Sequence, residues 1–208
     1  MAVRHPRPSQ PESLPTRREE HADATRAALL KAGRALFARD GYQKTSIDAV
    51  ARRARLTKGA LYHHFEDKRA LFDAVVVALQ NEMTATVDAR VAGERERWAR
   101  LKLGITAFLD ACGEPAYRRL VIQDAPAVLG MARFREIDDD ALDSFRRAIA
   151  SLHDKGEIDF ANAALLTRLV AALVWETAML LAEAAEPARL RDEALAAIYR
   201  VIDGFRRR

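Results

Sequence analysis

Residues 45–68 read TSIDAVARRARLTKGALYHHFEDK, and this stretch decides the fold. It predicts two short helices, over 46–54 and 58–65, joined by a tight turn at 55–57. Side chains able to cap a helix stand where these helices and the next one would begin: Thr45 or Ser46, Thr57, and Asp67. Two short helices at a steep angle, the second with a small and basic outer face, suit insertion into the major groove of DNA.

The outer face of the second predicted helix differs in chemistry from its inner face. A small helical core by itself explains the apolar positions of the motif, but not Lys58, Gly59 and Tyr62 together on the opposite side. Lys58 can reach a phosphate or a guanine edge, Tyr62 and His63 can hydrogen-bond phosphates, and Gly59 permits close approach to the groove. The residues predicted to bind DNA are Thr45, Ser46, Thr57, Lys58, Gly59, Tyr62, His63 and Lys68.

The pattern T-x-I-x-x-V-A-x-x-A-x-L-T-K-G-A-L-Y-x-H-F-x-x-K-x-x-L resembles the helix-turn-helix signature of TetR-type (tetracycline-repressor-like) transcriptional regulators. The resemblance covers about residues 26–72 and includes the preceding LFARDGY. One position departs from the pattern, because Arg55 stands in the turn where the family usually has glycine. If this position needs a left-handed backbone, a residue other than glycine costs about 1 kcal/mol, which a folded domain tolerates.

Composition predicts an all-α chain. Half of the 208 residues are hydrophobic, and only nine glycines and seven prolines occur, which favours long helices with short connections. The single cysteine, Cys112, fits a reducing cytoplasm. No run of about 18 uninterrupted apolar residues occurs and the N-terminus lacks an apolar signal region, so we expect a cytoplasmic protein without a membrane span.

The positive charge gathers around the motif. Residues 22–68 hold ten Lys and Arg against five Asp and Glu, a net charge of +5, whereas the whole chain carries +4. Neutralisation of DNA phosphates requires such a local excess. The distribution therefore favours DNA as the partner.

Three regions are expected along the chain. Residues 1–21 contain four of the seven prolines and predict a disordered N-terminal arm. Residues 22–68 are the three-helix, helix-turn-helix DNA-binding domain, whose first helix covers 22–39 and ends at Gly41 as a left-handed cap. Residues 69–208 form the C-terminal helical domain for ligand binding and dimerisation. Its helices are expected over 67–91, 94–112, 115–123, 132–155, 161–185 and 187–206, with an interruption at 124–126.

The helix predicted over 161–185 is apolar nearly all round, so it must be buried on nearly every side. In a domain of this size a second subunit most easily covers one of those sides. Two helices from each chain would then form a four-helix interface, as the last two helices of TetR-type proteins usually do. A homodimer with one reading head per chain implies a palindromic double-stranded DNA operator.

The resemblance also implies that a small molecule binds the C-terminal domain and lowers operator affinity, as expected of a repressor. The ligand is expected to be mostly apolar, in a pocket formed by Trp98, Phe108, Tyr117, Met131, Trp175, Glu176 and Met179. A carboxylate at 176, in line with apolar residues, needs a partner. That partner is either an arginine, within the subunit (Arg133 or Arg135) or across the dimer, or a polar or cationic group of the effector.

Catalytic and metal chemistry find little support in the chain. No motif links Cys112 to His153, and His63 and His64 point about 100° apart on a helix, so they cannot chelate one metal ion together. The acidic run at 138–140 is expected on a solvated outer face or at a local helix start. An alternative is a ligand-binding or carrier bundle that has lost contact with DNA. Such a protein would be expected to have a disrupted recognition helix, whereas the DNA-binding residues predicted above, such as Lys58, Gly59 and Tyr62, are present. We therefore expect no catalytic residue, no cofactor and no metal site.

Overall fold

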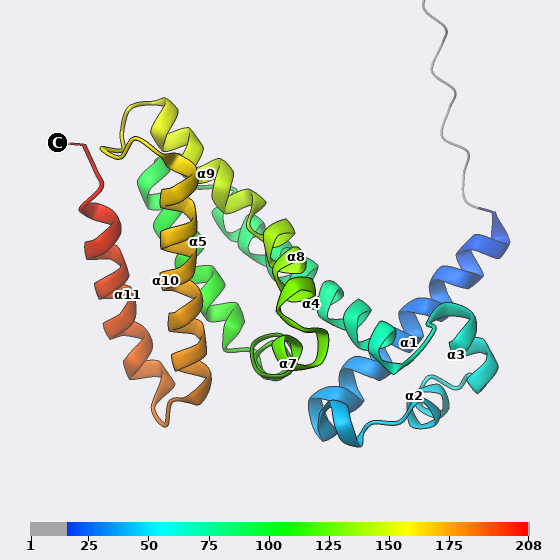
Figure 1. The fold of residues 1–208 in the computed structure, drawn as a ribbon. Helices are drawn as coiled ribbons and strands as arrows, with labels where there is room; N and C mark the ends of the chain where they lie inside the picture. Colours follow the sequence, from blue (N-terminus) through cyan, green and yellow to red (C-terminus); the bar gives the residue numbers. More distant parts are fainter. Residues whose placement is uncertain (1–15, 208) are drawn as a thin grey trace, which may run out of the picture.

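The computed structural model describes residues 16–207, and the chain is helical, as the composition predicts (Figure 1). The elements are α1 (Arg17–Lys44), α2 (Ile47–Arg53), α3 (Lys58–His64), α4 (Lys68–Val91), α5 (Arg97–Cys112), α6 (Pro115–Tyr117), the π-helical η1 (Arg118–Asp124), α7 (Ala125–Leu129), α8 (Met131–Ala141), α9 (Asp143–Asp154), α10 (Ala163–Glu183) and α11 (Pro187–Asp203). Within 16–207 the only β-type pairing is an isolated bridge between Ile158 and Arg206.

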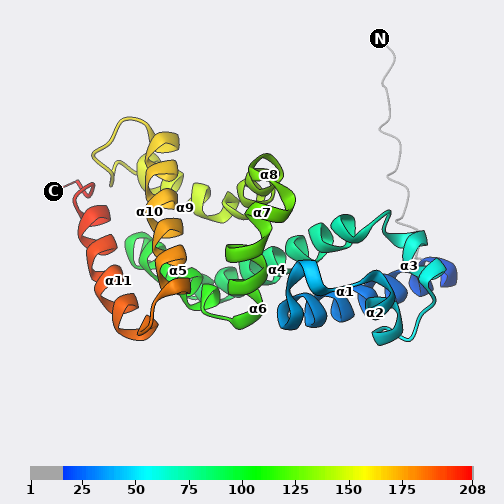
Figure 2. The ribbon, with the colours of Figure 1, turned by 60° about the horizontal axis from the view of Figure 1, so that its bottom comes forward.

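The molecule has a head and a body joined by α4. Figures 1 and 2 show α1, α2 and α3 at one end and α10 with α11 at the other. The head core contains an aromatic cluster in which Phe72, on α4, lies 5.2 Å from Phe37 and 5.1 Å from Tyr42 between ring centroids. In the body, α5 packs along α4, while α10 lies against α5, α9, α11 and η1. A single helix thus belongs to both cores.

The beginning of the chain differs from the sequence prediction. Helix α1 begins at Arg17, so residues 17–21 of the predicted arm are helical, and residues 1–15 lie outside the described residues. Gly41 has the expected positive φ of 81°, but its ψ of 165° makes a kink followed by one further helical turn. Only glycine adopts this backbone readily, and a Cβ at Gly41 would lie 2.8 Å from Arg119 Nη2.

Two predictions in the middle of the chain are wrong. The expected interruption at 124–126 is absent, because η1 runs directly into α7 and Pro126 lies within this continuous helical run. The single helix expected over 132–155 is two helices, divided at Leu142 (φ −76°, ψ −5°). Aspartates precede this break, and short acidic side chains are weak helix formers. Arg146 bridges it by donating to Asp139 Oδ1 at 2.9 Å.

Helix α10 is the one helix in the described part of the chain that is long and apolar enough to cross a membrane. Its apolar window contains Arg168 and Glu176, and 39% of it is buried inside this fold. A core helix of a helical bundle meets the same criterion of length and composition. The buried side of α10 accounts for the apolar residues on that side. The apolar residues on the opposite side face solvent in this single chain.

Candidate nucleic-acid interface and effector region

Side-chain caps fix the beginnings of α2, α3 and α4. The backbone N–H of Ala49 donates to Ser46 Oγ at 3.2 Å, and that of Ala60 donates to Thr57 Oγ1 at 3.1 Å. Asp67 Oδ1 likewise accepts from the N–H of Ala70 at 2.7 Å. The three predicted caps are confirmed, with Ser46 rather than Thr45 capping α2. Each cap contributes about 1 kcal/mol, which matters most for α2 and α3, because helices of seven residues are too short to be stable alone.

Arg55 adopts the left-handed backbone that the turn requires. Its φ is 59°, and it is the one residue other than glycine with positive φ in the described chain. This conformation lets the N–H of Leu56 donate to the carbonyl of Ala51 at 2.9 Å, which closes the end of α2. The conditional prediction about this position is therefore confirmed, and the turn keeps its geometry at a cost of about 1 kcal/mol.

The outer face of α3 is polar and exposed. Lys58, Gly59, Tyr62 and His63 are all exposed there, whereas Leu61 on the opposite side is completely buried. Lys58 Nζ lies 3.1 Å from Asp48 Oδ1 and 6.0 Å from the centroid of the Tyr62 ring. The hydrogen bond that the Lys58 ammonium donates to the Asp48 carboxylate raises the pKa of Lys58.

Two of the predicted DNA-binding residues make hydrogen bonds within the fold. Thr45 is 3% exposed, and its hydroxyl donates to the carbonyl of Gly41 at 2.9 Å. Lys68 Nζ donates to the carbonyl of Tyr42 at 3.0 Å and lies 4.3 Å from the centroid of its ring. Both side chains hold the link between α1 and α2, which explains their presence without DNA.

Three arginines that sequence reasoning did not select stand beside α3. Arg52 and Arg53 are exposed at the end of α2, and Arg55 is exposed in the turn. Their positions add positive charge next to the polar face of α3, where phosphates of a bound duplex would lie. The basic run ARRAR at 51–55 is the sequence feature that could have indicated these arginines. Because α2 ends within this run, the sequence alone does not show which of the arginines lie on the same side of the head.

The residues predicted to line the effector pocket do not converge. Trp98 is buried at the beginning of α5, where Arg206 lies 5.6 Å above its ring, and Phe108 follows about 15 Å further along the same helix. Trp175 contacts Phe134, with 5.2 Å between ring centroids. Three other members of the predicted set are exposed: Met131, Glu176 and Met179.

Glu176 does not have the expected partner within its own subunit. It lies on the exposed face of α10, and none of the described residues forms an ion pair with it. Arg133 is instead committed to Asp73, to which it donates two hydrogen bonds of 2.7 and 2.9 Å. The prediction of a salt bridge within the subunit, from Glu176 to Arg133 or Arg135, is therefore wrong.

A buried polar pair marks the interior of the body. The hydroxyl of Tyr117 donates to Gln80 Oε1, and both residues are 3% exposed. Burial raises the pKa of Tyr117 and, on α5 nearby, that of the Cys112 thiol, so both stay protonated. Burial and neighbouring Asp139 also raise the pKa of Asp138. No sequence pattern indicates that Gln80 is buried, since a glutamine on an amphipathic helix usually faces solvent.

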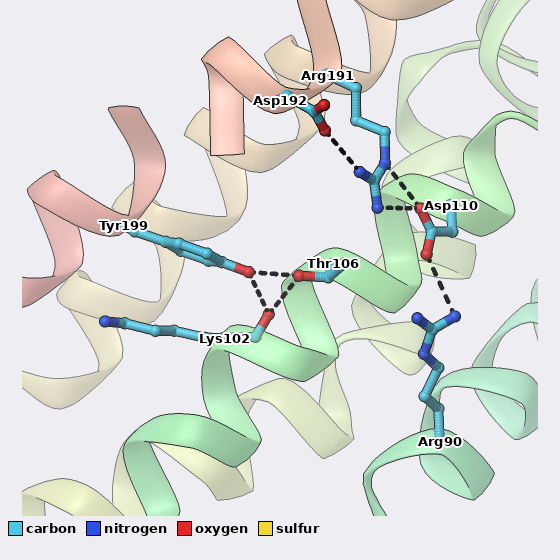
Figure 3. Close-up of polar contacts among 7 residues, drawn as sticks. All are labelled: Arg90, Lys102, Thr106, Asp110, Arg191, Asp192 and Tyr199. Carbon is cyan, nitrogen blue, oxygen red and sulfur yellow. Dashed lines mark hydrogen bonds and ion pairs between the residues drawn. The ribbon is translucent and has the colours of Figure 1, made fainter. Parts of the chain in front are cut away.

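Helix α11 is fastened to α5 by polar contacts (Figure 3). Asp110 accepts from Arg191 Nε at 2.8 Å and lies 3.2 Å from Arg90 Nη1 at the end of α4. The hydroxyl of Tyr199 lies between Thr106 Oγ1 and the carbonyl of Lys102, to which it donates at 3.1 Å. These contacts hold α11 in place and leave its other side exposed. A shallow hollow of about 220 Å³ beside Asp110 and Arg191 lies at the same junction.

Contacts from α4 also reach the elements that follow η1. Arg69, in the first turn of α4, donates to the carbonyl of Leu129 at 2.8 Å. The two bonds from Arg133 to Asp73 tie α8 to α4 one turn further along. A movement of α7 or α8 would therefore act on the end of α4 that carries the head.

Large apolar side chains remain exposed at the far end of the body. Within the described chain, five of the seven exposed large apolar residues belong to α10 and α11: Leu165, Leu169, Met179, Leu180 and Val201. The side chains His, Cys, Asp and Glu do not gather there, or elsewhere in 16–207, into a group of three able to hold a metal ion. The exposed apolar side chains at this end suit contact with a protein.

Comparison with known proteins agrees with this arrangement. Residues 29–75 match the family model for "Bacterial regulatory proteins, tetR family", and residues 98–205 match "Tetracyclin repressor-like, C-terminal domain". A TetR-family transcriptional regulator from Pectobacterium atrosepticum superimposes with a TM-score of 0.80 at 32% identity, covering 93% of this chain and 99% of that one. RolR in complex with resorcinol gives a TM-score of 0.67 at 17% identity, covering 88% and 89% of the two chains, which shows a shared fold.

Curated relatives align over shorter stretches. The TetC protein of transposon Tn10 from Escherichia coli is 28% identical over 122 residues, 57% of this chain and 60% of TetC. The transcriptional regulator UidR from Escherichia coli K12 is 31% identical over 75 residues, 36% of this chain and 38% of UidR. The chain thus spans about three fifths and two fifths of these relatives. The family models and the Pectobacterium structure together cover the head and the body, and the chain belongs to the TetR family of bacterial regulatory proteins.

Proposed function

We propose that the chain is a homodimeric, sequence-specific DNA-binding regulator of transcription that represses its target and leaves its operator when a small molecule binds. The exposed face of α3 carries this proposal. A helix whose inner side is fully buried and whose outer side presents a lysine, a glycine, a tyrosine and a histidine has the size and chemistry for the major groove.

The DNA-binding part is tested by selection from random duplexes with purified protein, followed by titration of the selected site. Lys58→Ala and Tyr62→Phe should each lose about 1–3 kcal/mol of specific binding while the melting temperature stays unchanged. Lys155→Ala is the matched control, because this lysine is exposed in the body after α9. If both head variants bind like wild type, α3 does not read DNA.

The dimer is supported by the exposed apolar residues of α10 and α11. Leu165, Leu169 and Leu180 leave an unusual amount of apolar surface in water for a single chain. Two such helices from each subunit would bury it in a four-helix interface. Light scattering at micromolar concentration should give twice the mass of the chain, and a stable monomer would contradict the proposal.

The effector is proposed to bind in the body beside the Gln80–Tyr117 pair, where a mostly apolar ligand could exchange its own polar group for one of these two. A thermal-shift screen of neutral aromatic and lipophilic cationic compounds tests this. A compound that stabilises wild type and releases the selected DNA should bind Tyr117→Phe more weakly. Equal binding to both proteins would place the effector elsewhere.

A further inference from the structure

The exposed face of α10 has an internal symmetry in its sequence. Ala172 stands in its middle, Leu165 and Met179 lie seven residues before and after it, and Arg168 and Glu176 lie four residues before and after it. At 3.6 residues per turn, these pairs fall about 20° and about 40° to either side of Ala172. All five residues are exposed to solvent in the single chain, with Leu165 46% and Met179 39% exposed.

Such a face is complementary to a second copy of itself. A two-fold axis perpendicular to the helix at the level of Ala172 places two α10 helices antiparallel. A residue a given number of positions before Ala172 then lies level with the residue the same number of positions after Ala172 in the other chain. Leu165 then meets Met179 of the other chain. Four residues correspond to about 6 Å of helix, so Arg168 lies level with the opposite Glu176. The small side chain of Ala172 allows the two backbones to approach at the crossing.

The two charged side chains of this face, Arg168 and Glu176, form no close ion pair within the described part of one chain. Arg168 is 78% exposed, and its nearest carboxylate, Asp139, lies 4.0 Å away. Glu176 has no ion pair among the described residues, although apolar side chains flank it on both sides. Covering this face with an uncharged apolar partner would leave both charges desolvated and unpaired, which is costly. A partner that offers an arginine and a glutamate in reversed order avoids this cost, and a second copy of this chain does so.

We propose that two chains pair through α10 in an antiparallel register centred on Ala172, with two symmetry-related ion pairs between Arg168 of one chain and Glu176 of the other. This rests on the homodimer proposed above and specifies how the subunits recognise one another. The apolar residues hold the interface together, and the two ion pairs fix its register and discourage pairing with a chain that lacks this charge order.

Charge reversal tests the register with the full-length chain. Arg168→Glu places two glutamates together at both symmetry-related positions, and Glu176→Arg places two arginines there. Each variant alone should raise the dimer dissociation constant at least about tenfold, because like charges then face each other twice. The double variant Arg168→Glu/Glu176→Arg restores opposite charges and should regain most of the wild-type affinity. Arg147→Glu, at an exposed site on α9, is the control reversal.

Mixing the two single variants gives the sharpest result. One chain then offers two glutamates and the other two arginines, so the mixed dimer has both ion pairs while each homodimer has none. Differently tagged chains should co-purify as the mixed species in large excess over either homodimer. Because both variants are judged by recovery of pairing, a folding defect cannot imitate the expected result.

The possible failures are distinguishable. If wild type is a monomer, both the homodimer and this register are overturned. If wild type is a dimer and neither the reversals nor the mixture alters its affinity, the register alone is overturned. A disulfide provides an independent readout: Ala172→Cys should cross-link two chains under mild oxidation, whereas Lys31→Cys, exposed on α1, should not. Absence of the Ala172→Cys cross-link in a dimeric protein also overturns the register.

Discussion

Substitution of Gly59 distinguishes what the fold tolerates at this position from what DNA binding tolerates. A Cβ at this position would meet only Thr57 Oγ1, at 3.9 Å, so the protein itself has room for a side chain. Alanine is favoured over glycine inside a helix by about 1 kcal/mol. Gly59→Ala should therefore keep or raise the melting temperature, yet weaken binding of the selected DNA about tenfold or more because the added methyl group meets the groove.

Gly104→Ala is the matched control for this substitution. Gly104 also lies within a helix, and a Cβ there would be 3.7 Å from Val91 Cγ1, an ordinary contact. It lies in the body, so DNA binding should not change. Fluorescence anisotropy and thermal denaturation of both variants decide the matter, and unchanged DNA affinity in Gly59→Ala would mean that α3 does not approach the groove closely there.

Asp138 should make stability depend on pH in a recognisable direction. Burial first, and then Asp139, raise the pKa of this carboxyl in the folded chain. The folded state therefore binds the Asp138 proton more tightly than the unfolded state does. The resulting contribution to the free energy of unfolding is present in acid and is lost as pH rises through the raised pKa. Asp138→Asn should accordingly raise the melting temperature at pH 7, and the gain should shrink in acid.

Asp140→Asn is the control for this prediction, since Asp140 is exposed two residues away on the same helix. Thermal denaturation of the two variants from about pH 4 to pH 8 makes the comparison. An equal effect of both substitutions at every pH would show that burial of Asp138 is not responsible.

The sequence predicts individual residues well where their partners are near in the chain. Ser46, Thr57 and Asp67 cap helices through N–H groups three residues away, and residue type and spacing reveal this. The hydrogen bonds of Thr45 and Lys68 are harder to predict, because their partners are carbonyls at the end of α1. For Lys68 the carbonyl lies 26 residues away, so its role becomes visible only once α1 and α4 are packed together.

The joint between α4 and α8 is held by a two-point contact. Arg133 donates to both carboxylate oxygens of Asp73, with side chains 41% and 26% exposed. Solvent screens such a pair, so we expect a coupling free energy of about 0.5 to 1 kcal/mol in a double-mutant cycle of Arg133→Gln and Asp73→Asn, measured by urea unfolding. Additive effects of the two substitutions would show that the contact contributes nothing to stability.

Helices are predicted most reliably where apolar periodicity is long. The extents of α4 and α10 agree with the sequence within a few residues, because many buried positions define them. The region between α5 and α10 was misread at both ends. The sequence pattern predicts a break at Pro126, but the helical run continues through this residue, and the chain divides at Leu142, a residue type that does not itself stop helices.

DNA binding by the whole dimer should depend steeply on salt. Each phosphate contact releases condensed counterions, so the logarithm of the binding constant should fall linearly with the logarithm of the salt concentration. Lys58→Ala removes one cation from each head, so the slope should decrease by about two for the dimer. Anisotropy titrations across a KCl series measure this. An unchanged slope would mean that Lys58 contacts no phosphate.

The division into a DNA-reading head and a helical body is visible in the sequence, but the residues predicted to line the effector pocket do not gather in one place. An apolar helix shows that its sides are covered, without showing what covers each side. Glu176 and Met179 were assigned to a pocket because they share α10 with buried residues such as Val174 and Ala178. Both side chains are exposed in the folded chain, so they belong to its outer surface. The interior is marked instead by Gln80, on a different helix.

The symmetry of α10 has a genetic consequence. One gene encodes both halves of the contact, so an allele altered at Arg168 changes the interface twice in its own homodimer and once in a dimer with the wild-type product. An allele damaged only in α3 keeps the contact intact and captures wild-type subunits in dimers with one functional head. Reading-head alleles should therefore be dominant over wild type, whereas charge-reversal alleles of α10 should be recessive.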